Sequence, residues 1–547
     1  MTSSKRKTII ITLLSLLYSL FVVIGNSFLL KDSFKYIEKH IFLNIIMFIV
    51  LFIVFYFILN KLFYFLDKKK TIKLNIKKIK KTKFYHLFDK KTFLFSLIFI
   101  IICWLPYIIS FYPAILSPDP SFQIKQYFGI PNKYSTYNIM LDPSMSITNH
   151  HPVIHTLLLG SCVKIGTIIN NVNLGLFIYS IIQILVLAST LSYTIKFLKD
   201  NGIKNNYLIL MLLVYSLVPV FPFYSMSAVK DVIFGSLIIL YIIFLYRIIK
   251  SDDIKINNIF ILTLLLILIV LFRNNGIHVI VLSFPTLLLL KKKFRYKFKL
   301  LVIFLIIIGF NYSYNNIILP HYKITPVSSR EMLSIPFQQT ARYVKEHGDE
   351  VSDKERDVID TVLGYDTLAD RYKPELADPV KNNFNKYSSS DDLKDYFKVW
   401  FKELKKHPKT YIEATINNTY GYFYPSKTNW YIYYKYNHTI TYDGFDYHYN
   451  NLKIPRYILA SYGIAFPYIP VLNILVNIAI NVWILLFMGA YYLYRKKYRE
   501  IIYLLPCYIL ILVCFASPAN AYFRYALPYV FALMLNLGLF VKEVYEK

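Results

Sequence analysis

Long apolar blocks alternate with short polar segments along most of the chain. An α-helix needs about 20 apolar residues to cross a bilayer, because the hydrocarbon core is roughly 30 Å thick. Ten blocks close to that length lie at about 8–30, 41–66, 93–112, 174–196, 206–222, 231–249, 299–319, 467–494, 500–516 and 523–541. The pattern therefore predicts an all-α polytopic membrane protein.

Three further apolar segments are shorter. Segments 258–272 and 276–290 flank a polar turn that contains Arg273, which predicts two short helices in place of one long helix. Segment 153–169 carries a histidine and a lysine, a composition that favours a helix along the outer interface or a re-entrant segment. About twelve transmembrane helices are expected, with one interfacial helix in the first large outer loop.

The charge of the chain supports a definite orientation. The formal net charge is +30, yet residues 320–455 carry 19 acidic and 19 basic side chains, so the whole excess lies elsewhere. It is concentrated in short loops between apolar blocks: eleven Lys within 67–92, six Lys or Arg within 291–299 and four within 495–499. This positive-inside pattern predicts cytoplasmic loops that face anionic lipid. Since each basic run flanks a predicted span, a nucleic-acid partner is not expected.

The topology depends on segment 153–169. If this segment does not cross the bilayer, every strongly basic loop lies in the cytoplasm. The protein is then expected in the plasma membrane, with both of its termini in the cytoplasm. An alternative stays open, in which 153–169 spans and 258–290 forms one long helix. It would place Arg273 near the middle of the membrane and move the basic residues of 247–255 to the outer side.

Four regions are predicted: an N-terminal helical hairpin with a basic loop at 1–92, a membrane core at 93–319 with an outer loop at 113–173, an extracytoplasmic domain at 320–455, and three C-terminal membrane helices at 456–547. The extracytoplasmic domain is expected to be rich in α-helix. Within it, Ser352 and Glu355 have the spacing of a capping box at a helix start.

Two groups in this domain are candidates for contacts. Gln338, Gln339 and Arg342 lie within one helical turn and are expected to dock the domain on the cavity. The Tyr- and Trp-rich stretch 420–450 can stack on sugar rings or lipid head groups, or it can form the core of the domain.

Common catalytic and metal motifs are absent from the sequence. The four cysteines lie in apolar segments without CxxC spacing, which indicates neither a disulfide framework nor a zinc knuckle. No GxGxxG, Walker A, GxSxG or HExxH pattern occurs. A nucleotide-driven pump, a serine hydrolase and a zincin are therefore not expected.

The outer loop after 93–112 carries the first candidate for chemistry, Asp119, in the sequence Ser117-Pro118-Asp119-Pro120. Flanking prolines restrict the backbone, so the carboxylate is expected on a rigid loop at the membrane surface. There it can take a proton from an acceptor hydroxyl or bind a divalent cation beside a phosphate. Alternatively, it only begins a turn or a helix.

The same loop contains His150 and His151, which precede Pro152 and an apolar helix. A helix N-terminus favours anions, so both histidines are candidates for phosphate binding. His151 is four residues before His155 and can share a helix face with it, which also makes His151 a candidate metal ligand together with Asp119. The alternative is a pair of polar anchors at the interface.

Basic residues at three other predicted helix ends complete the candidate site. Lys230 begins the block 231–249, where the positive end of the helix dipole calls for an anionic partner, although a surface pair with Asp231 is the alternative. Arg273 and Asn274 lie between two short helices, and an Arg at that depth suits a lipid phosphate. Arg524, at the start of the last block, either binds phosphate or extends its charge to the interface.

The layout resembles a known superfamily. An acidic residue in the first outer loop, an HP-containing helix after it, many further spans and a late soluble domain are similar to the C-type glycosyltransferases, such as protein mannosyltransferases and aminoarabinose transferases. More narrowly, the sequences SPDPSFQI, NHHPVIHTLL, SAVKD, FRNNG, LSIPFQQTAR, HPKTYIEA and YFRYALP resemble a group of uncharacterised Gram-positive membrane proteins.

The resemblance implies an inverting transferase that moves a sugar from a polyprenyl-phosphate carrier to an envelope polymer or protein at the outer face. Asp119 matches the acidic residue that assists the acceptor or a divalent cation in that superfamily, and His151-Pro152 matches its HP motif. The Asp-Glu pair of some members is absent, because Pro120 follows Asp119. Two other functions stay open: a transporter or flippase for a lipid-linked glycan, and a non-enzymatic envelope protein.

Overall fold

The computed structural model of the chain describes residues 3–68, 83–253, 255–425, 440–442 and 445–545. Helices dominate these residues, and a short antiparallel hairpin of β1 (Ile440–Tyr442) and β2 (Phe445–Tyr447) is the sheet among them. The predicted all-α class is confirmed. Most of the basic loop at 67–92 and much of the Tyr-rich stretch lie outside the described residues, at 69–82, 426–439 and 443–444.

Eight helical segments of the described chain are long and apolar enough to cross a membrane. They are α1 (Ser3–Lys31), α3 (Ile41–Asp67), α5 (Thr92–Ser110), α9 (Val172–Asp200), α12 (Lys230–Lys250), α15 (Phe294–Ser313) with its continuation to His321, Tyr498–Phe515 with α26 (Leu505–Phe515), and Phe523–Tyr545 with α27 (Phe523–Phe531) and α28 (Leu533–Tyr545). The pair α10 (Asn205–Leu217) and α11 (Val220–Met226), bent by 48°, gives a ninth if it is one span. The chain is therefore a multi-pass membrane protein.

Four apolar helices are shorter: α8 (Val153–Ile168), α13 (Ile256–Phe272), the run of α14 (Gly276–Ser283) and η2 (Phe284–Leu289), and α24 (Ile478–Tyr494). The predicted block 467–494 is thus wrong at its start, since α24 begins only at Ile478. Residues before it form the short turns η7 (Phe466–Tyr468) and η8 (Leu472–Leu475). Pro467 and Pro470 lack an amide hydrogen, which prevents a continuous helix there.

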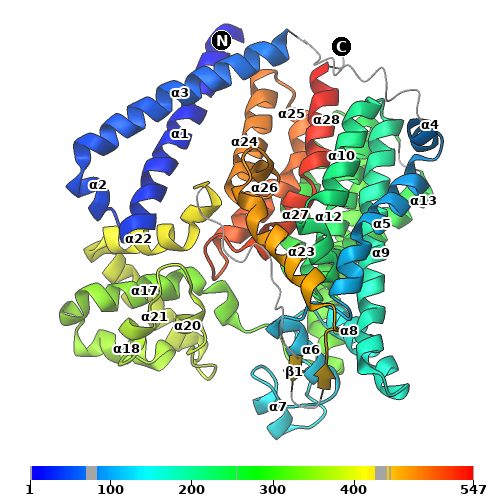
Figure 1. Cartoon of the computed structure of the whole chain (residues 1–547). Helices are drawn as coiled ribbons and strands as arrows, with labels where there is room; N and C mark the ends of the chain where they lie inside the picture. The colour runs from blue at the N-terminus through cyan, green and yellow to red at the C-terminus, as the bar shows by residue number, and fades with distance from the viewer. Residues whose placement is uncertain (1–2, 69–82, 254, 426–439, 443–444, 546–547) are drawn as a thin grey trace.

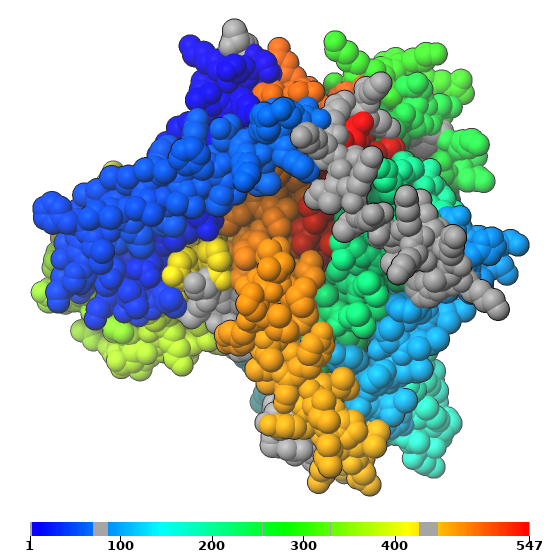
Figure 2. Space-filling view, turned by 45° about the horizontal axis from the view of Figure 1, so that its top comes forward, coloured from blue at the N-terminus to red at the C-terminus, as the bar shows by residue number. Residues whose placement is uncertain are grey.

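Helix α12 lies at the centre of the bundle and α3 at its edge. The apolar window of α12 is 83% buried, whereas that of α3 is only 6% buried. α12 packs on α9, α13 and α27, and the N-terminal hairpin of α1 and α3 packs on α24 and on the segment around η6 (Tyr420–Tyr422). Figure 2 shows the N-terminal hairpin, in blue, beside the orange segment that includes α24.

Both chain termini lie at one end of the bundle, here called the termini end (Figure 1). Ion pairs join helix ends there: Lys7–Asp67 at 3.1 Å, Lys199–Asp89 at 2.9 Å and Lys250–Glu543 at 2.7 Å. The basic segments 291–299 and 495–499 lie at the same end, through Lys292–Asp252 (2.9 Å) and a hydrogen bond from Arg499 to the Ile249 carbonyl (2.9 Å). The opposite end, where α12 begins, is here called the site end.

Helix α8 forms a hairpin with the start of α9 at the site end. Gly166 and Gly175 touch where the two helices meet, so closely that a Cβ on Gly166 would lie 2.7 Å from the Gly175 Cα. His151, two residues before the start of α8, contacts Lys230 at the start of α12. Because α9 runs from this hairpin to the termini end, both ends of α8 lie at the site end.

The predicted domain 320–455 divides into separate parts. One is a helical unit with its own apolar core, made of α17 (Ser334–His347), α18 (Asp353–Leu363), α19 (Leu368–Arg371), α20 (Asp378–Lys381), α21 (Ser390–Lys406) and α22 (Pro408–Thr419). The predicted capping box is confirmed, with Ser352 N donating to Glu355 at 2.9 Å. Residues 420–424 instead pack on the bundle, and β2 packs on α9.

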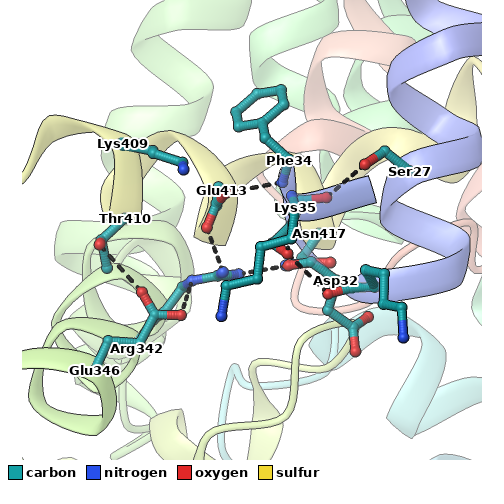
Figure 3. A network of polar contacts seen from close by, with 12 residues as sticks. Ser27, Asp32, Phe34, Lys35, Arg342, Glu346, Lys409, Thr410, Glu413 and Asn417 are labelled. Carbon is teal, nitrogen blue, oxygen red and sulfur yellow. Dashed lines mark hydrogen bonds and ion pairs between the residues drawn. The ribbon is translucent and has the colours of Figure 1, made fainter. Parts of the chain in front are cut away.

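The helical unit docks on the turn between α1 and α2 (Lys35–Lys39), as Figure 3 shows. Arg342 donates to the carbonyl of Asp32 (2.8 Å) and to Glu413 (2.5 Å), whose other oxygen accepts from Phe34 N (2.8 Å). Gln338 and Gln339 bond within the unit. The prediction that these three residues dock the domain on the cavity is therefore wrong, because Arg342 faces the N-terminal hairpin.

The remaining helical segments are short. They are α4 (Lys83–Lys90), α6 (Pro118–Tyr127), α7 (Thr136–Leu141), η3 (Tyr314–Ile318), α16 (Leu319–His321), η4 (Ser329–Met332), η5 (Gly348–Glu350), η6 (Tyr420–Tyr422), α23 (Lys453–Ala465), α25 (Tyr498–Ile501) and η9 (Ile502–Leu504).

Candidate active site

A cavity of about 710 Å³ lies at the site end, between the bundle and the helical unit. Its walls come from the loop that begins α6, the starts of α12 and α27, the turn between α13 and α14, and the segments around η4 and α20. The walls include all seven residues singled out from the sequence for catalysis or phosphate binding: Asp119, His150, His151, Lys230, Arg273, Asn274 and Arg524. The structure thus brings together side chains from five distant segments.

Asp119 lies in the first turn of α6, which begins at Pro118. Its Oδ2 accepts a hydrogen bond from Arg524 Nη2 at 2.7 Å, and its side chain is 27% exposed to the cavity. Burial raises the pKa of this carboxyl, but the positive charges of Arg524 and Lys230 lower it by more, so the net pKa is well below its usual range. Asp119 is therefore an ionised carboxylate at any physiological pH.

A second carboxylate, Asp231, is buried directly behind the cavity wall. Its Oδ1 lies 2.7 Å from Arg273 Nη1, and its Oδ2 lies 3.2 Å from Arg524 Nε. Asp231 is fully buried, so it holds both guanidinium groups in place in a region of low dielectric. The alternative of a surface pair between Lys230 and Asp231 is wrong, because the buried carboxylate of Asp231 pairs with the two arginines. The only sign of this role in the sequence is the position of Asp231, an acidic residue in the first turn of α12 beside Lys230.

Lys230 has no such counterion. Its Nζ lies 3.3 Å from His151 Nδ1, and no carboxylate oxygen of the described chain is within ion-pair distance of it. As the first residue of α12, it also lies at the positive end of the helix dipole. An ammonium in this position favours an anion in the cavity.

The cavity walls carry a net positive charge. Five cationic side chains (Lys133, Lys230, Arg273, Lys381 and Arg524) face three carboxylates (Asp119, Glu331 and Asp378) among the lining residues. Lys230, Arg273 and Arg524 come from helix ends of the bundle, and Lys133 comes from the loop between α6 and α7. Glu331 comes from η4, and Asp378 and Lys381 come from α20 of the helical unit. Sequence patterns did not single out this second group, because nothing local links α20 to α6.

The two adjacent histidines are neutral. The His150 ring stacks on Tyr134 at 3.9 Å between centroids, and burial lowers its pKa to about 4 although Glu331 raises it. Burial and Lys230 lower the pKa of His151 well below its usual value. His151 Nε2 is buried and has no hydrogen-bond partner among the described residues. A neutral ring nitrogen is thus available to a ligand.

Asn274 has a positioning contact in the structure. Its amide donates to the carbonyl of Asn149 at 2.7 Å, which ties the α13–α14 turn to the residue before His150. Asp142 lies apart from the cavity walls and pairs with Lys323 at 2.7 Å.

A divalent metal on Asp119 and His151 stays a prediction. In the structure Asp119 Oδ2 accepts from Arg524 and His151 Nδ1 faces Lys230, so His151 Nε2 is the ring nitrogen that has no partner among the described residues. The expected pairing of His151 with His155 is wrong, because both ring nitrogens of His155 are bonded, to Gln123 (3.1 Å) and Tyr179 (2.7 Å). Within the described residues, the group of three possible ligands lies elsewhere, in the helical unit.

Comparison with known proteins gives a family but no activity. The sequence model of a family of unknown function, DUF6020, matches residues 2–546 of the chain. No curated protein and no solved structure matches it.

Proposed function

Because the chain belongs to the DUF6020 family, whose function is unknown, we propose an activity from its cavity. The protein is a membrane glycosyltransferase that transfers a sugar from a polyprenyl-phosphate carrier to an acceptor of the cell envelope. The observation that carries the proposal is the convergence of Asp119 with Lys230, Arg273 and Arg524 in one cavity at the site end of a membrane bundle.

The orientation follows from the charge asymmetry. The basic segments 291–299 and 495–499 lie at the termini end, so the positive-inside rule places that end in the cytoplasm of the plasma membrane and the site end outside. Nine long segments and three short ones, α13, α14 with η2, and α24, then give twelve spans. Helix α8, with both ends at the site end, is the interfacial helix of this topology.

The cationic wall suits the phosphate of the carrier. Lys230 has no carboxylate within ion-pair distance among the described residues. Arg273 and Arg524 are fixed by Asp231, and both guanidinium groups line the cavity. Donors fixed in advance stabilise negative charge that develops on the leaving phosphate. Their position at the membrane surface is where a lipid carrier presents its head group.

The transfer requires one base. The bond between the anomeric carbon and the phosphate oxygen breaks, and the acceptor oxygen bonds to that carbon from the opposite face. The acceptor proton passes to Asp119, and polyprenyl phosphate leaves with the electron pair. Paired with Arg524, Asp119 is a weak base, because its pKa is well below the usual range. A donor phosphate that draws Arg524 toward itself would raise the basicity of Asp119 when the substrate is bound.

The helical-unit side of the cavity is the place for the acceptor. Glu331 contacts Lys381 of α20 at 2.8 Å and His150, from the loop before α8, at 3.6 Å, and all three line the cavity. Mixed charges and a stacked aromatic ring at Tyr134 suit a hydroxyl-rich acceptor such as an envelope polymer or glycoprotein. No step requires a metal.

The test uses the full chain purified in detergent. Radiolabelled polyprenyl monophosphate, the shared product of all such donors, should bind at one site per chain, and Lys230→Gln should weaken binding about tenfold, a loss of about 1.4 kcal/mol. Lys323→Gln is the matched control, since Lys323 pairs with Asp142 outside the cavity walls. Absence of saturable binding, or equal losses in both variants, would contradict the proposal.

A transporter for a lipid-linked glycan would use the same cations, so turnover decides between the two. A transferase releases polyprenyl phosphate from polyprenyl-phosphate hexoses when an envelope extract supplies acceptors. A transporter moves the intact lipid across proteoliposomes and leaves the sugar–phosphate bond unbroken.

A further inference from the structure

Three potential metal ligands converge in the helical unit, away from the cavity walls. His347 ends α17, Glu350 ends η5, and His407 connects α21 to α22. One ligand atom from each residue lies within 4.8 Å of the other two. Two imidazoles and one carboxylate are a donor set that divalent zinc takes in proteins.

The carboxylate of Glu350 contacts both imidazoles. Its Oε1 is 3.4 Å from His347 Nδ1, and its Oε2 is 3.1 Å from His407 Nε2. The rings stack face to face, with centroids 3.7 Å apart and planes 10° from parallel. Each ring therefore presents one nitrogen to the same carboxylate, and a metal in the plane of both rings requires one imidazole to turn out of this stack.

The hydrogen bonds around His347 fix its tautomer. Thr410 Oγ1 donates its proton to Glu346 Oε2 (3.1 Å), so it must accept from His347 Nε2 (3.1 Å). With the ring proton on Nε2, the lone pair of Nδ1 faces Glu350. An outer hydrogen bond that orients the second nitrogen is the usual support of a metal-binding histidine.

Lys406 occupies part of this group in the metal-free chain. Its Nζ lies 2.6 Å from Glu350 Oε2, so a metal and Lys406 compete for one carboxylate. Glu350 is 34% exposed, which leaves room for water as a further ligand. Competition predicts a moderate affinity that rises when Lys406 loses its charge.

We propose that His347, Glu350 and His407 form a structural binding site for a divalent transition metal, with zinc favoured by the nitrogen-rich donor set. The metal would join the end of α17 to the turn between α21 and α22, which are 60 residues apart along the chain for His347 and His407. It would stabilise the helical unit and take no part in the chemistry of the cavity.

The test is zinc binding by the full chain in detergent after treatment with a chelator. Calorimetric titration and metal analysis should give one zinc per chain, with a rise in the unfolding temperature. His407→Ala and Glu350→Gln should each lower the affinity at least tenfold, whereas Lys406→Gln should raise it. His321→Ala, a histidine at the exposed α16, is the matched control.

The opposite signs separate a site from general surface binding. Equal affinity in the wild type and in His407→Ala would overturn the proposal, as would weaker binding in Lys406→Gln or a stoichiometry that depends on His321. Thermal unfolding of each metal-free variant shows whether it is folded. Polyprenyl phosphate binding at the cavity is measured separately, so the two proposals can fail independently.

Discussion

Arg524 Nη2 lies 2.7 Å from Asp119 Oδ2, across 405 residues of sequence. The same guanidinium lies 3.2 Å from Asp231, which also holds Arg273. Arg524 thus connects Asp119, the proposed base, to Asp231 and, through Asp231, to the second phosphate-binding arginine, Arg273. A substrate phosphate that attracts Arg524 would at the same time release Asp119 to accept a proton.

Asp119→Asn should abolish sugar transfer and leave the fold intact. The amide keeps the shape and can still accept from Arg524, but it cannot take a proton, and general-base catalysis contributes about 10²–10⁴-fold. Release of polyprenyl phosphate should therefore fall at least 100-fold, with carrier binding retained. Asp142→Asn, at a pair apart from the cavity walls, should behave as the wild type. A fully active Asp119→Asn would remove the role proposed for this residue.

Asp231→Asn should destabilise the protein and weaken carrier binding. Removing one partner of a buried ion pair leaves an uncompensated charge and costs about 3–5 kcal/mol, and here two arginines lose their shared carboxylate. The unfolding temperature in detergent and the affinity for polyprenyl phosphate are the measurements. Asp366→Asn breaks the exposed pair with Arg356 and should cost less than about 1 kcal/mol. Similar losses of stability and of carrier affinity in Asp231→Asn and Asp366→Asn would show that Asp231 does not hold the two arginines in place.

The helical unit should lose stability as the pH rises above about 4.5. Burial raises the pKa of Glu403 to about 8, although its hydrogen bond with Tyr411 lowers it. The folded state therefore binds more protons than the unfolded state between pH 4.5 and 8. The stability contributed by protonated Glu403 is fully present below the pKa that this residue has in the unfolded state. It falls by up to about 1.4 kcal/mol per pH unit until the pH passes the pKa of Glu403 in the folded state.

Glu403→Gln removes this dependence. Unfolding temperatures of the variant and the wild type should agree more closely at pH 5 than at pH 8, where the variant should be the more stable. Equal pH profiles would mean that Glu403 does not titrate in this range.

Gly166→Ala should disrupt the hairpin of α8 and α9. The added Cβ would lie 2.7 Å from the Asn171 carbonyl oxygen and from the Gly175 Cα, and backbone atoms cannot move aside as a flexible side chain can. Overpacking of this kind costs about 1–3 kcal/mol, so folded yield and unfolding temperature should fall. In Gly309→Ala in α15, the new Cβ would have no heavy atom within 4 Å apart from the adjacent backbone of its own helix, so it should have no such effect.

Local rules explain why much of the fold could be predicted. A membrane helix satisfies its own backbone hydrogen bonds, so apolar length alone identifies most spans. Ser352 and Glu355 are three residues apart, and their capping box needs no distant partner. The expectation that the prolines keep Asp119 on a loop is wrong, because proline is tolerated at the first position of a helix, and Asp119 lies in the first turn of α6. These features, and the side of the membrane that each basic loop favours, are contained in short stretches of sequence.

The tertiary structure alone decided which groups meet. Asp231 pairs with Arg273 and Arg524, Arg342 docks on the turn after α1, and His155 is bonded to Gln123 and Tyr179. Each of these partners depends on how helices pack, and ion pairing or hydrogen bonding has no signature in sequence spacing when the partners lie far apart. The sequence therefore determined which residues can carry charge near the helix ends. Packing determined which of these charges neutralise one another. It also determined which of them, like Lys230, line the cavity without a carboxylate at ion-pair distance among the described residues.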